Sequence, residues 1–206
     1  MTYLEKYFPS VTPLQRQQFA DLAATCRDWN DKINVVSRKD IDNLETNHIL
    51  HSLAIGRFIQ FKKGSVVIDL GTGGGFPALP LAILFPDVHF HLVDRVGKKL
   101  KVAEEIAKAC GLENVSFQHG DFKECKIDAD FVVSRAVMTQ NELVRLARKN
   151  IGKDNFNAVP NGLISLKGGD LSAELSQLKD PTETVDIKTF FDEPYFESKK
   201  IVYTAL

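Results

Sequence analysis

The sequence predicts an α/β fold, with a Rossmann-like, mostly parallel sheet, helices on both faces and a short helical extension at the amino terminus. Three observations predict it. From residue 65 onward, apolar runs typical of buried strands alternate with helical patterns, and no strand pattern precedes them. A glycine-rich turn follows the first strand. Such βαβ alternation is typical of parallel sheets, whose ligands bind at the carboxyl ends of the strands.

The first sixty residues are predicted to be helical. Thr12 followed by Pro13 is typical of an N-cap and a first helical residue. Apolar residues then recur at three- and four-residue steps, at Phe19, Leu22, Cys26, Trp29 and Ile33. A second helical stripe covers residues 50–59. We therefore expect residues 1–62 to form a helical extension packed on a core domain of residues 63–206.

The core domain follows from the same periodicities. The expected order is strand 65–70, helix 78–85, strand 89–94, helix 97–110, strand 115–119, strand 130–134, helix 139–150 and strand 163–167. Gly111 is a typical residue to end the second of these helices. The segments Val185–Phe191 and Lys200–Thr204 are expected to pair as antiparallel strands at the sheet edge.

Composition restricts the class of protein. A hydrophobic content of 44% with 26% charged residues is ordinary for a globular protein and compatible with a soluble enzyme. No apolar run approaches the ~20 residues that span a bilayer, and the amino terminus lacks the pattern of a signal peptide. Three scattered cysteines without a C-x-x-C pair suit free thiols in a reducing compartment. We expect a cytoplasmic monomer with no membrane contact and no metal.

Charge is unevenly distributed along the chain. The formal net charge of −1 argues against indiscriminate binding to nucleic acid. Even so, Arg95, Lys98, Lys99 and Lys101 form a basic run with no acid between them. Such a run is either a solvated helix face or a contact for a phosphate backbone, and the sequence leaves both open.

The turn after the first predicted strand carries the strongest chemical signal. The strand ends near Asp69, and glycines follow at 71, 73 and 75, where the main chain can turn sharply and approach a ligand. A dinucleotide site needs a third glycine where this chain has Phe76. A G-x-G-x-G after an acid is instead similar to S-adenosylmethionine-dependent methyltransferases. The predicted cofactor-binding residues of this turn are Asp69, Gly71, Thr72, Gly73, Gly75 and Phe76.

Two further acids follow the next two strands. Asp94 ends the second strand, about 20 residues after the glycines, where an acid can accept hydrogen bonds from ribose hydroxyls. Asp121 follows the third strand and is a candidate to accept from an adenine amino group. Both can also be surface carboxylates without a ligand. His89 and His91 share a strand face, but no third ligand stands at usable spacing, so we expect no metal site there.

Several runs, in order along the chain, resemble the bacterial small-subunit rRNA guanine-N7 methyltransferases, also called the glucose-inhibited division protein B family. The most specific runs from Asp69 to Ala82 (DLGTGGGFPALPLA). The others are Trp29–Asn34, Leu92–Lys99, Val133–Ala136 and Leu166–Gly168. Together they extend from residue 29 to residue 168. The chain departs from the family pattern at Asn47, at His51 and at Lys199, which stands where the family usually has an arginine.

The resemblance implies a class I methyltransferase that transfers a methyl group from S-adenosylmethionine to N7 of a guanosine in a conserved loop of 16S rRNA, as free rRNA or as a small-subunit ribonucleoprotein. It implies cofactor contacts from the glycines and Asp94, and catalytic roles facing the reaction site for Arg135 and Lys167. The implied substrate contacts are Asn30, Lys32, Asn34, Lys98, Lys99 and Lys199.

The implied reaction requires few catalytic groups from the protein. N7 of guanine has an exposed lone pair and no proton to lose, so no general base is required. Catalysis then rests on positioning, with electrostatic tuning second. Arg135 is expected to bind a phosphate, the guanine O6 or the cofactor carboxylate. The alternatives are a methyltransferase acting on another RNA, a protein or a small molecule, a nicotinamide-dependent dehydrogenase, and a non-catalytic RNA-binding module.

Overall fold

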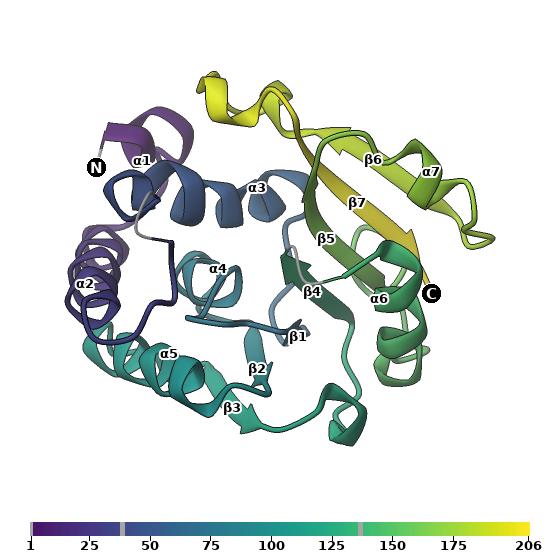
Figure 1. Ribbon diagram of the computed structural model, residues 1–206, viewed down its shortest axis with the longest axis horizontal. Helices are drawn as coiled ribbons and strands as arrows, with labels where there is room; N and C mark the ends of the chain where they lie inside the picture. The colour runs from purple at the N-terminus through teal and green to yellow at the C-terminus, as the bar shows by residue number, and fades with distance from the viewer. Residues whose placement is uncertain (1, 38–39, 136–137) are drawn as a thin grey trace.

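The computed structural model describes residues 2–37, 40–135 and 138–206. Ala136, which ends one of the quoted motifs, lies outside the described residues. A seven-stranded sheet forms the centre of the molecule, in the order β3-β2-β1-β4-β5-β7-β6 (Figure 1). The first five strands run parallel, and β7 is antiparallel to both of its neighbours. The strands are β1 Val66–Leu70, β2 His89–Asp94, β3 Val115–His119, β4 Phe131–Arg135, β5 Gly162–Gly168, β6 Thr182–Asp186 and β7 Lys199–Ala205.

Helices cover both faces of the sheet, as the sequence predicted. The described α-helices are α1 Thr2–Tyr7, α2 Pro13–Asn30, α3 His51–Phe58, α4 Ala78–Leu84, α5 Gly97–Ala109, α6 Gln140–Ala147 and α7 Ser172–Leu175. Alternate strand residues belong to two separate cores because successive side chains point to opposite faces. Val67 packs with the core that includes α1 to α5, whereas Ile68 packs with the core beneath α6.

The amino-terminal helix α2 begins where predicted. Thr12 and Gln15 form a reciprocal capping box, in which each side chain binds the other residue's backbone N–H. Further hydrogen bonds join α2 to the core: the Gln15 amide donates to the Ile83 carbonyl at 2.8 Å, and the Gln18 amide donates to the Cys110 carbonyl at 3.0 Å. Helices α1 and α2 thus complete the core of the sheet domain, and the division at residue 62 stays a prediction.

The second amino-terminal helix has an unexpected start. Residues Glu45–Leu50 form a π-helix that leads directly into α3. A π-turn is often associated with functional sites, because it changes the direction of the side chains around it. Here it carries Asn47 and His48 to the wall of a cavity at the sheet edge.

The prediction for the carboxyl-terminal tail was wrong at both ends of its first strand, expected at Val185–Phe191 and observed at Thr182–Asp186. The antiparallel pair exists, but β6 ends at Asp186 and a 3₁₀-helix, Ile187–Thr189, follows. Ile187 and Phe191 are buried in the core, and their four-residue spacing suits one face of a helix as well as one face of a strand. The Phe190 and Phe191 N–H groups bond the Ile187 carbonyl, which makes this segment helical. The predicted helix 139–150 is also shorter, since α6 ends at Ala147 and continues as a 3₁₀ turn.

The described histidines, cysteines and helices bear on the expectations about metals, thiols and membranes. His89 and His91 both hydrogen-bond to the Ser116 hydroxyl at 2.8 Å. Among the described residues, no group of three or more His, Cys, Asp or Glu side chains is arranged to hold a metal ion. The three cysteines are buried free thiols, as predicted. No helix in the described part of the chain is long and apolar enough to cross a membrane.

Candidate functional site

The glycine turn joins β1 to α4 and needs glycine for two different reasons. Gly73 and Gly75 have φ angles of +59° and +97°, which disfavour other residues. A Cβ at Gly75 would lie 2.3 Å from Cδ1 of Leu79, so this glycine allows α4 to pack closely against the turn. A Cβ at Gly73 would meet nothing within 4 Å, because this residue lines a cavity.

Asp69 lies beneath the turn and does not line the cavity. Its side chain is fully buried. One carboxylate oxygen accepts hydrogen bonds from the Thr72 hydroxyl at 2.7 Å and from the Ala78 N–H at 3.1 Å. The other oxygen has no partner among the described residues. Burial raises the pKa of Asp69 to about 7. The acid therefore ties the turn to the first turn of α4.

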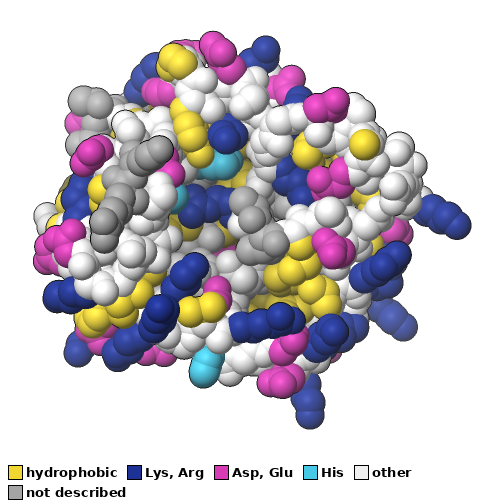
Figure 2. All heavy atoms as spheres, viewed as in Figure 1, with side chains coloured by type: hydrophobic (Ala, Val, Ile, Leu, Met, Phe, Trp, Pro, Cys, Tyr) yellow, Lys and Arg dark blue, Asp and Glu magenta, His cyan; other side chains and the backbone are white. Residues whose placement is uncertain are grey.

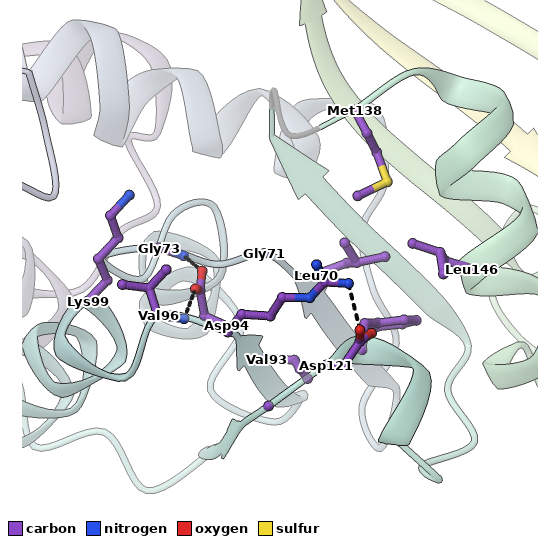
Figure 3. A pocket seen from close by; sticks show the side chains of 13 residues that line it. Leu70, Gly71, Gly73, Val93, Asp94, Val96, Lys99, Asp121, Met138 and Leu146 are labelled. Atoms are coloured by element: carbon purple, nitrogen blue, oxygen red, sulfur yellow. Dashed lines mark hydrogen bonds and ion pairs between the residues drawn. The ribbon is translucent and has the colours of Figure 1, made fainter.

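Asp94 stands at the carboxyl end of β2 with its carboxylate in the cavity wall. One oxygen accepts from the Gly73 N–H and the other from the Val96 N–H, both at 2.7 Å (Figure 3). A carboxylate has about four acceptor positions, so two remain for a ligand. These two acceptor oxygens fit a ribose with two adjacent hydroxyls, because both hydroxyls would find a carboxylate oxygen already fixed in position.

The cavity beside Asp94 has a volume of about 290 Å³ and mostly apolar walls. Figure 3 shows Met138 and Leu146 projecting into it from the side of α6, opposite Asp94 and Asp121. Asp121 forms an ion pair with Arg95 at 2.6 Å. The Lys123 N–H, followed by Arg95, lowers the pKa of this carboxyl. Apolar walls with a carboxylate acceptor at one end suit a purine with an exocyclic amino group.

A second cavity of about 300 Å³ opens at the ends of β4 and β5. Arg135 ends β4, and its guanidinium lies over the Phe76 ring at 5.3 Å, so it borders the glycine turn as well. No hydrogen bond or ion pair joins this guanidinium to another described residue. The other residues lining the cavity are Asp40, Asn47, His48, His51, Leu166, Lys167, Gly168, Tyr195 and Lys199.

Two neutral histidines line this second cavity. His51 is buried, and its Nε2 atom has no hydrogen-bond partner among the described residues. Burial, then the Arg135 charge, holds the pKa of His51 well below its usual value. The same causes lower the pKa of His48 to about 3. The charge of this cavity therefore comes from its arginine, lysine and aspartate side chains.

Lys167 has a different environment from Arg135. Its ammonium donates to the Met138 carbonyl at 2.8 Å and pairs with Glu174 at 2.6 Å, and its side chain is only 7% exposed. A shallow hollow lies between the two cavities and shares Met138 with the first and Lys167 with the second. The three hollows thus follow one another along the carboxyl edge of the sheet. Figure 2 shows cationic and histidine side chains at the bottom of the hollow at the centre of this face.

The predicted substrate residues occupy different environments. Asn30 is buried, and its side-chain oxygen accepts from the Val35 and Val36 N–H groups at 2.9 Å, so it shapes the segment after α2. Lys32 is exposed, with its ammonium 5.0 Å from the centre of the half-buried Trp29 ring.

The other predicted substrate residues lie at the surface or at a cavity rim. Asn34 and Lys98 are exposed, Lys99 borders the first cavity, and Lys199 borders the second with its ammonium over the Tyr195 ring at 4.7 Å. Figure 2 shows lysine and arginine side chains along the lower rim of this face, over α5 and the end of β3.

Sequence reasoning missed several residues of both cavities. Met138 and Leu146 line the first, and Asp40 and Tyr195 line the second. Asp40 and Tyr195 are far from the glycine turn along the chain, so no local pattern connects them with it. Met138 carried a usable signal, since it lies just beyond the predicted fourth strand, at the edge where ligands bind.

Comparison with known proteins gives a consistent result. The family model described as rRNA small subunit methyltransferase G matches residues 15–191. A ribosomal RNA small subunit methyltransferase G from Parabacteroides distasonis is 56% identical over 203 residues, covering 98% of this chain and 88% of that protein. One from Bacteroides fragilis is 55% identical over the full length of both chains.

Solved structures share the fold. A tRNA methyltransferase from Aquifex aeolicus matches with a TM-score of 0.57 and 18% identity, covering 75% of this chain and 68% of that one. A SAM-dependent methyltransferase from the same organism matches with a TM-score of 0.57 and 16% identity, covering 82% of this chain and 98% of that one. At this identity the likeness concerns the fold alone, and the fold is the Rossmann-like one of class I methyltransferases.

Proposed function

The chain belongs to the rRNA small subunit methyltransferase G family, and from that premise we propose that it methylates N7 of a guanosine in a conserved loop of 16S rRNA. The methyl donor in this proposal is S-adenosylmethionine, and the enzyme acts as a cytoplasmic monomer. The observation that carries the proposal is the row of hollows along the carboxyl edge of the sheet. One has the features of an adenosyl site, and another has an unpaired arginine beside it.

The residues around the first cavity fit the proposed cofactor. Asp94 would hold the ribose, Asp121 would accept from the adenine amino group, and the walls from Met138 and Leu146 would cover the purine. Gly71 and Gly73 leave the backbone open to the ligand. When bound, the cofactor supplies a methyl group already activated by a sulfonium. Asp69, Thr72, Gly75 and Phe76 would act indirectly, because they fix the turn from below.

The protein's part in the reaction is to bind and position the guanosine. N7 has no proton to lose, so the proposed reaction needs no acid of the site to act as a base. Holding reactants in line provides at most about 7–11 kcal/mol of barrier lowering. Arg135 is the candidate for the reaction site, because its guanidinium touches Phe76 of the turn and also borders the second cavity. Lys167 would act from the next strand end, with its ammonium held by Glu174.

The cations along the lower rim of the face in Figure 2 form the proposed RNA-binding surface. Lys98 and Lys99 at the start of α5 and Lys32 with Asn34 after α2 would contact RNA phosphates or sugars around the first cavity. The target base must be unstacked, because the deep major groove of an RNA helix hides N7. With few such cations, the affinity for RNA should fall with salt on a shallow slope.

The proposal is tested by nucleoside mass spectrometry of rRNA from cells with and without the gene for this chain. We expect 7-methylguanosine in 16S rRNA only when the protein is present, and purified protein should restore it with S-adenosylmethionine. Incubation with free rRNA, small ribosomal subunits and a metabolite extract in parallel identifies the substrate. Calorimetry with S-adenosylhomocysteine tests the cofactor site on its own. Unchanged 7-methylguanosine, or methyl transfer to the metabolite extract alone, would contradict the proposal.

A further inference from the structure

The second cavity combines charges in a way that the proposed cofactor site does not explain. Arg135 and Lys199 line it, and neither cation has a hydrogen bond or an ion pair with another described residue. His51 presents a buried nitrogen without a partner. Asp40 is the acid among the described lining residues, and Lys167, the remaining cation, is already paired with Glu174. Unpaired cations, an unused buried nitrogen and a lone carboxylate around one cavity indicate a ligand with both anionic and hydrogen-bond donor groups.

We propose that this cavity receives the target nucleotide, and that the Asp40 carboxylate accepts hydrogen bonds from N1–H and the exocyclic amine of guanine. The inference rests on the proposed function and adds the residue that selects the base. A volume of about 300 Å³ is at the lower end of the range for small-ligand pockets, which suits one nucleotide and no longer segment.

The sign of the charges decides which group binds which part of the nucleotide. As N7 uses its lone pair to bond the methyl carbon, the electrons of the broken carbon–sulfur bond remain on sulfur, and the purine gains one positive charge. A cation against the base would oppose that change, whereas a carboxylate would favour it. Arg135 and Lys199 therefore bind phosphate oxygens, and Asp40 binds the base. Methylation makes N1–H more acidic, so its bond to the carboxylate strengthens toward the transition state, which accelerates the reaction.

Two hydrogen bonds fix the Asp40 carboxylate in position. One carboxylate oxygen accepts from the Ser37 hydroxyl at 2.6 Å, and the other accepts from the Asn47 amide at 3.2 Å. The Ser37 hydrogen bond lowers the pKa of Asp40, so the group is ionised at neutral pH. Each oxygen keeps a lone pair for a guanine donor. Adenine has an acceptor at N1, which an ionised carboxylate would repel, so the same residue selects guanine over adenine.

The test removes one hydrogen-bond donor group from the target base. Small ribosomal subunits are reconstituted with 16S rRNA that carries guanosine or inosine at the mapped methylation position, since inosine lacks only the exocyclic amine. For the wild-type enzyme we expect kcat/KM to be about tenfold lower on inosine, the effect of one charge-assisted hydrogen bond. Asp40→Ala should lower kcat/KM on guanosine about 10- to 100-fold and reduce the guanosine-to-inosine ratio to about one.

Controls separate a direct contact from a structural effect. Asp42→Ala changes an exposed acid two residues away that does not line the cavity, and its ratio should equal that of the wild type. Asp40→Asn keeps one acceptor oxygen for the Asn47 amide, and its NH2 can donate to the Ser37 hydroxyl. The variant loses the charge and one acceptor, so its ratio should be intermediate. Calorimetry with S-adenosylhomocysteine reports whether each variant is folded.

Three results would overturn the inference. An Asp40→Ala variant that loses activity equally on both substrates, with an unchanged ratio, would make the residue structural. Tighter RNA binding by Asp40→Ala with unchanged base selectivity would mean that the cavity holds phosphate alone. A wild-type enzyme that forms no 7-methylguanosine would remove the proposed function and this inference together, whereas the first two results leave the proposed function intact.

Discussion

Replacement of Gly75 by alanine tests the packing of the glycine turn quantitatively. The φ angle of +97° costs an alanine about 1–2 kcal/mol. The new Cβ would lie 2.3 Å from Cδ1 and 2.7 Å from Cγ of Leu79, a fully buried side chain in α4. Relieving such overpacking costs about 1–3 kcal/mol. The free energy of unfolding should therefore fall by about 2–5 kcal/mol, a large part of the total of a domain.

The matched control is Gly111→Ala at the end of α5. This glycine has a φ angle of +62°, and a Cβ there would meet nothing within 4 Å, so only the backbone cost of about 1 kcal/mol applies. Urea unfolding followed by circular dichroism measures both variants. The reasoning is refuted if the two variants lose the same free energy within about 0.5 kcal/mol, because the contact with Leu79 would then contribute nothing.

Three further predictions concern the acids and the lysine of the site. The fold raises the pKa of Asp69 from 3.8 to about 7, so its contribution to stability is full below about pH 4 and is lost as the pH rises to about 7. The unfolding free energy of the wild type should fall relative to that of Asp69→Asn by about 1.4 kcal/mol per pH unit in that window, and parallel pH profiles would contradict this. Asp94→Asn should weaken S-adenosylhomocysteine binding at least tenfold in calorimetry, because one carboxylate acceptor is replaced by an amide NH2 that cannot accept; equal affinity would remove Asp94 from the cofactor site. Lys167→Met should lower stability by about 2–4 kcal/mol, because it leaves the partly buried Glu174 carboxylate with the Gln140 N–H but without its cation, and adding Glu174→Gln should restore part of that loss; no recovery would show that the pair is not coupled.

The architecture of the sheet domain was predictable because the short sequence patterns of its strands, helices and turns all agree with it. Short apolar runs, the capping residues and the glycine turn each act over a few residues, and the βαβ alternation then determines a parallel sheet. The order of the strands at the far edge depends on how β7 inserts between β5 and β6, which no short pattern specifies. Residues 185–191 were assigned to a strand because their apolar residues are compatible with both periodicities, and tertiary packing of Phe191 favoured the helical one.

The functional site was predictable only for residues that directly follow the ends of neighbouring strands. Asp94 and Asp121 come directly after strands that lie beside the glycine turn, so topology brings them to one cavity. Asp69 was expected to face the ligand, but its position three residues before Thr72 lets it bond the turn internally. The second cavity joins segments from residue 40 to residue 199, whose proximity depends on the whole core, and Asp40 therefore had no sequence signature.

The hydrogen bonds from α2 limit how the protein can be shortened. The amides of Gln15 and Gln18 occupy carbonyls at the ends of α4 and α5, and Phe19 and Leu22 fill the same core without exposure to solvent. A truncated chain starting at Gly64 would expose that apolar surface and leave those carbonyls to water. Minimal versions for engineering or crystallography should therefore keep the amino-terminal helices, and the cuts that the protein tolerates are to be sought in its exposed loops.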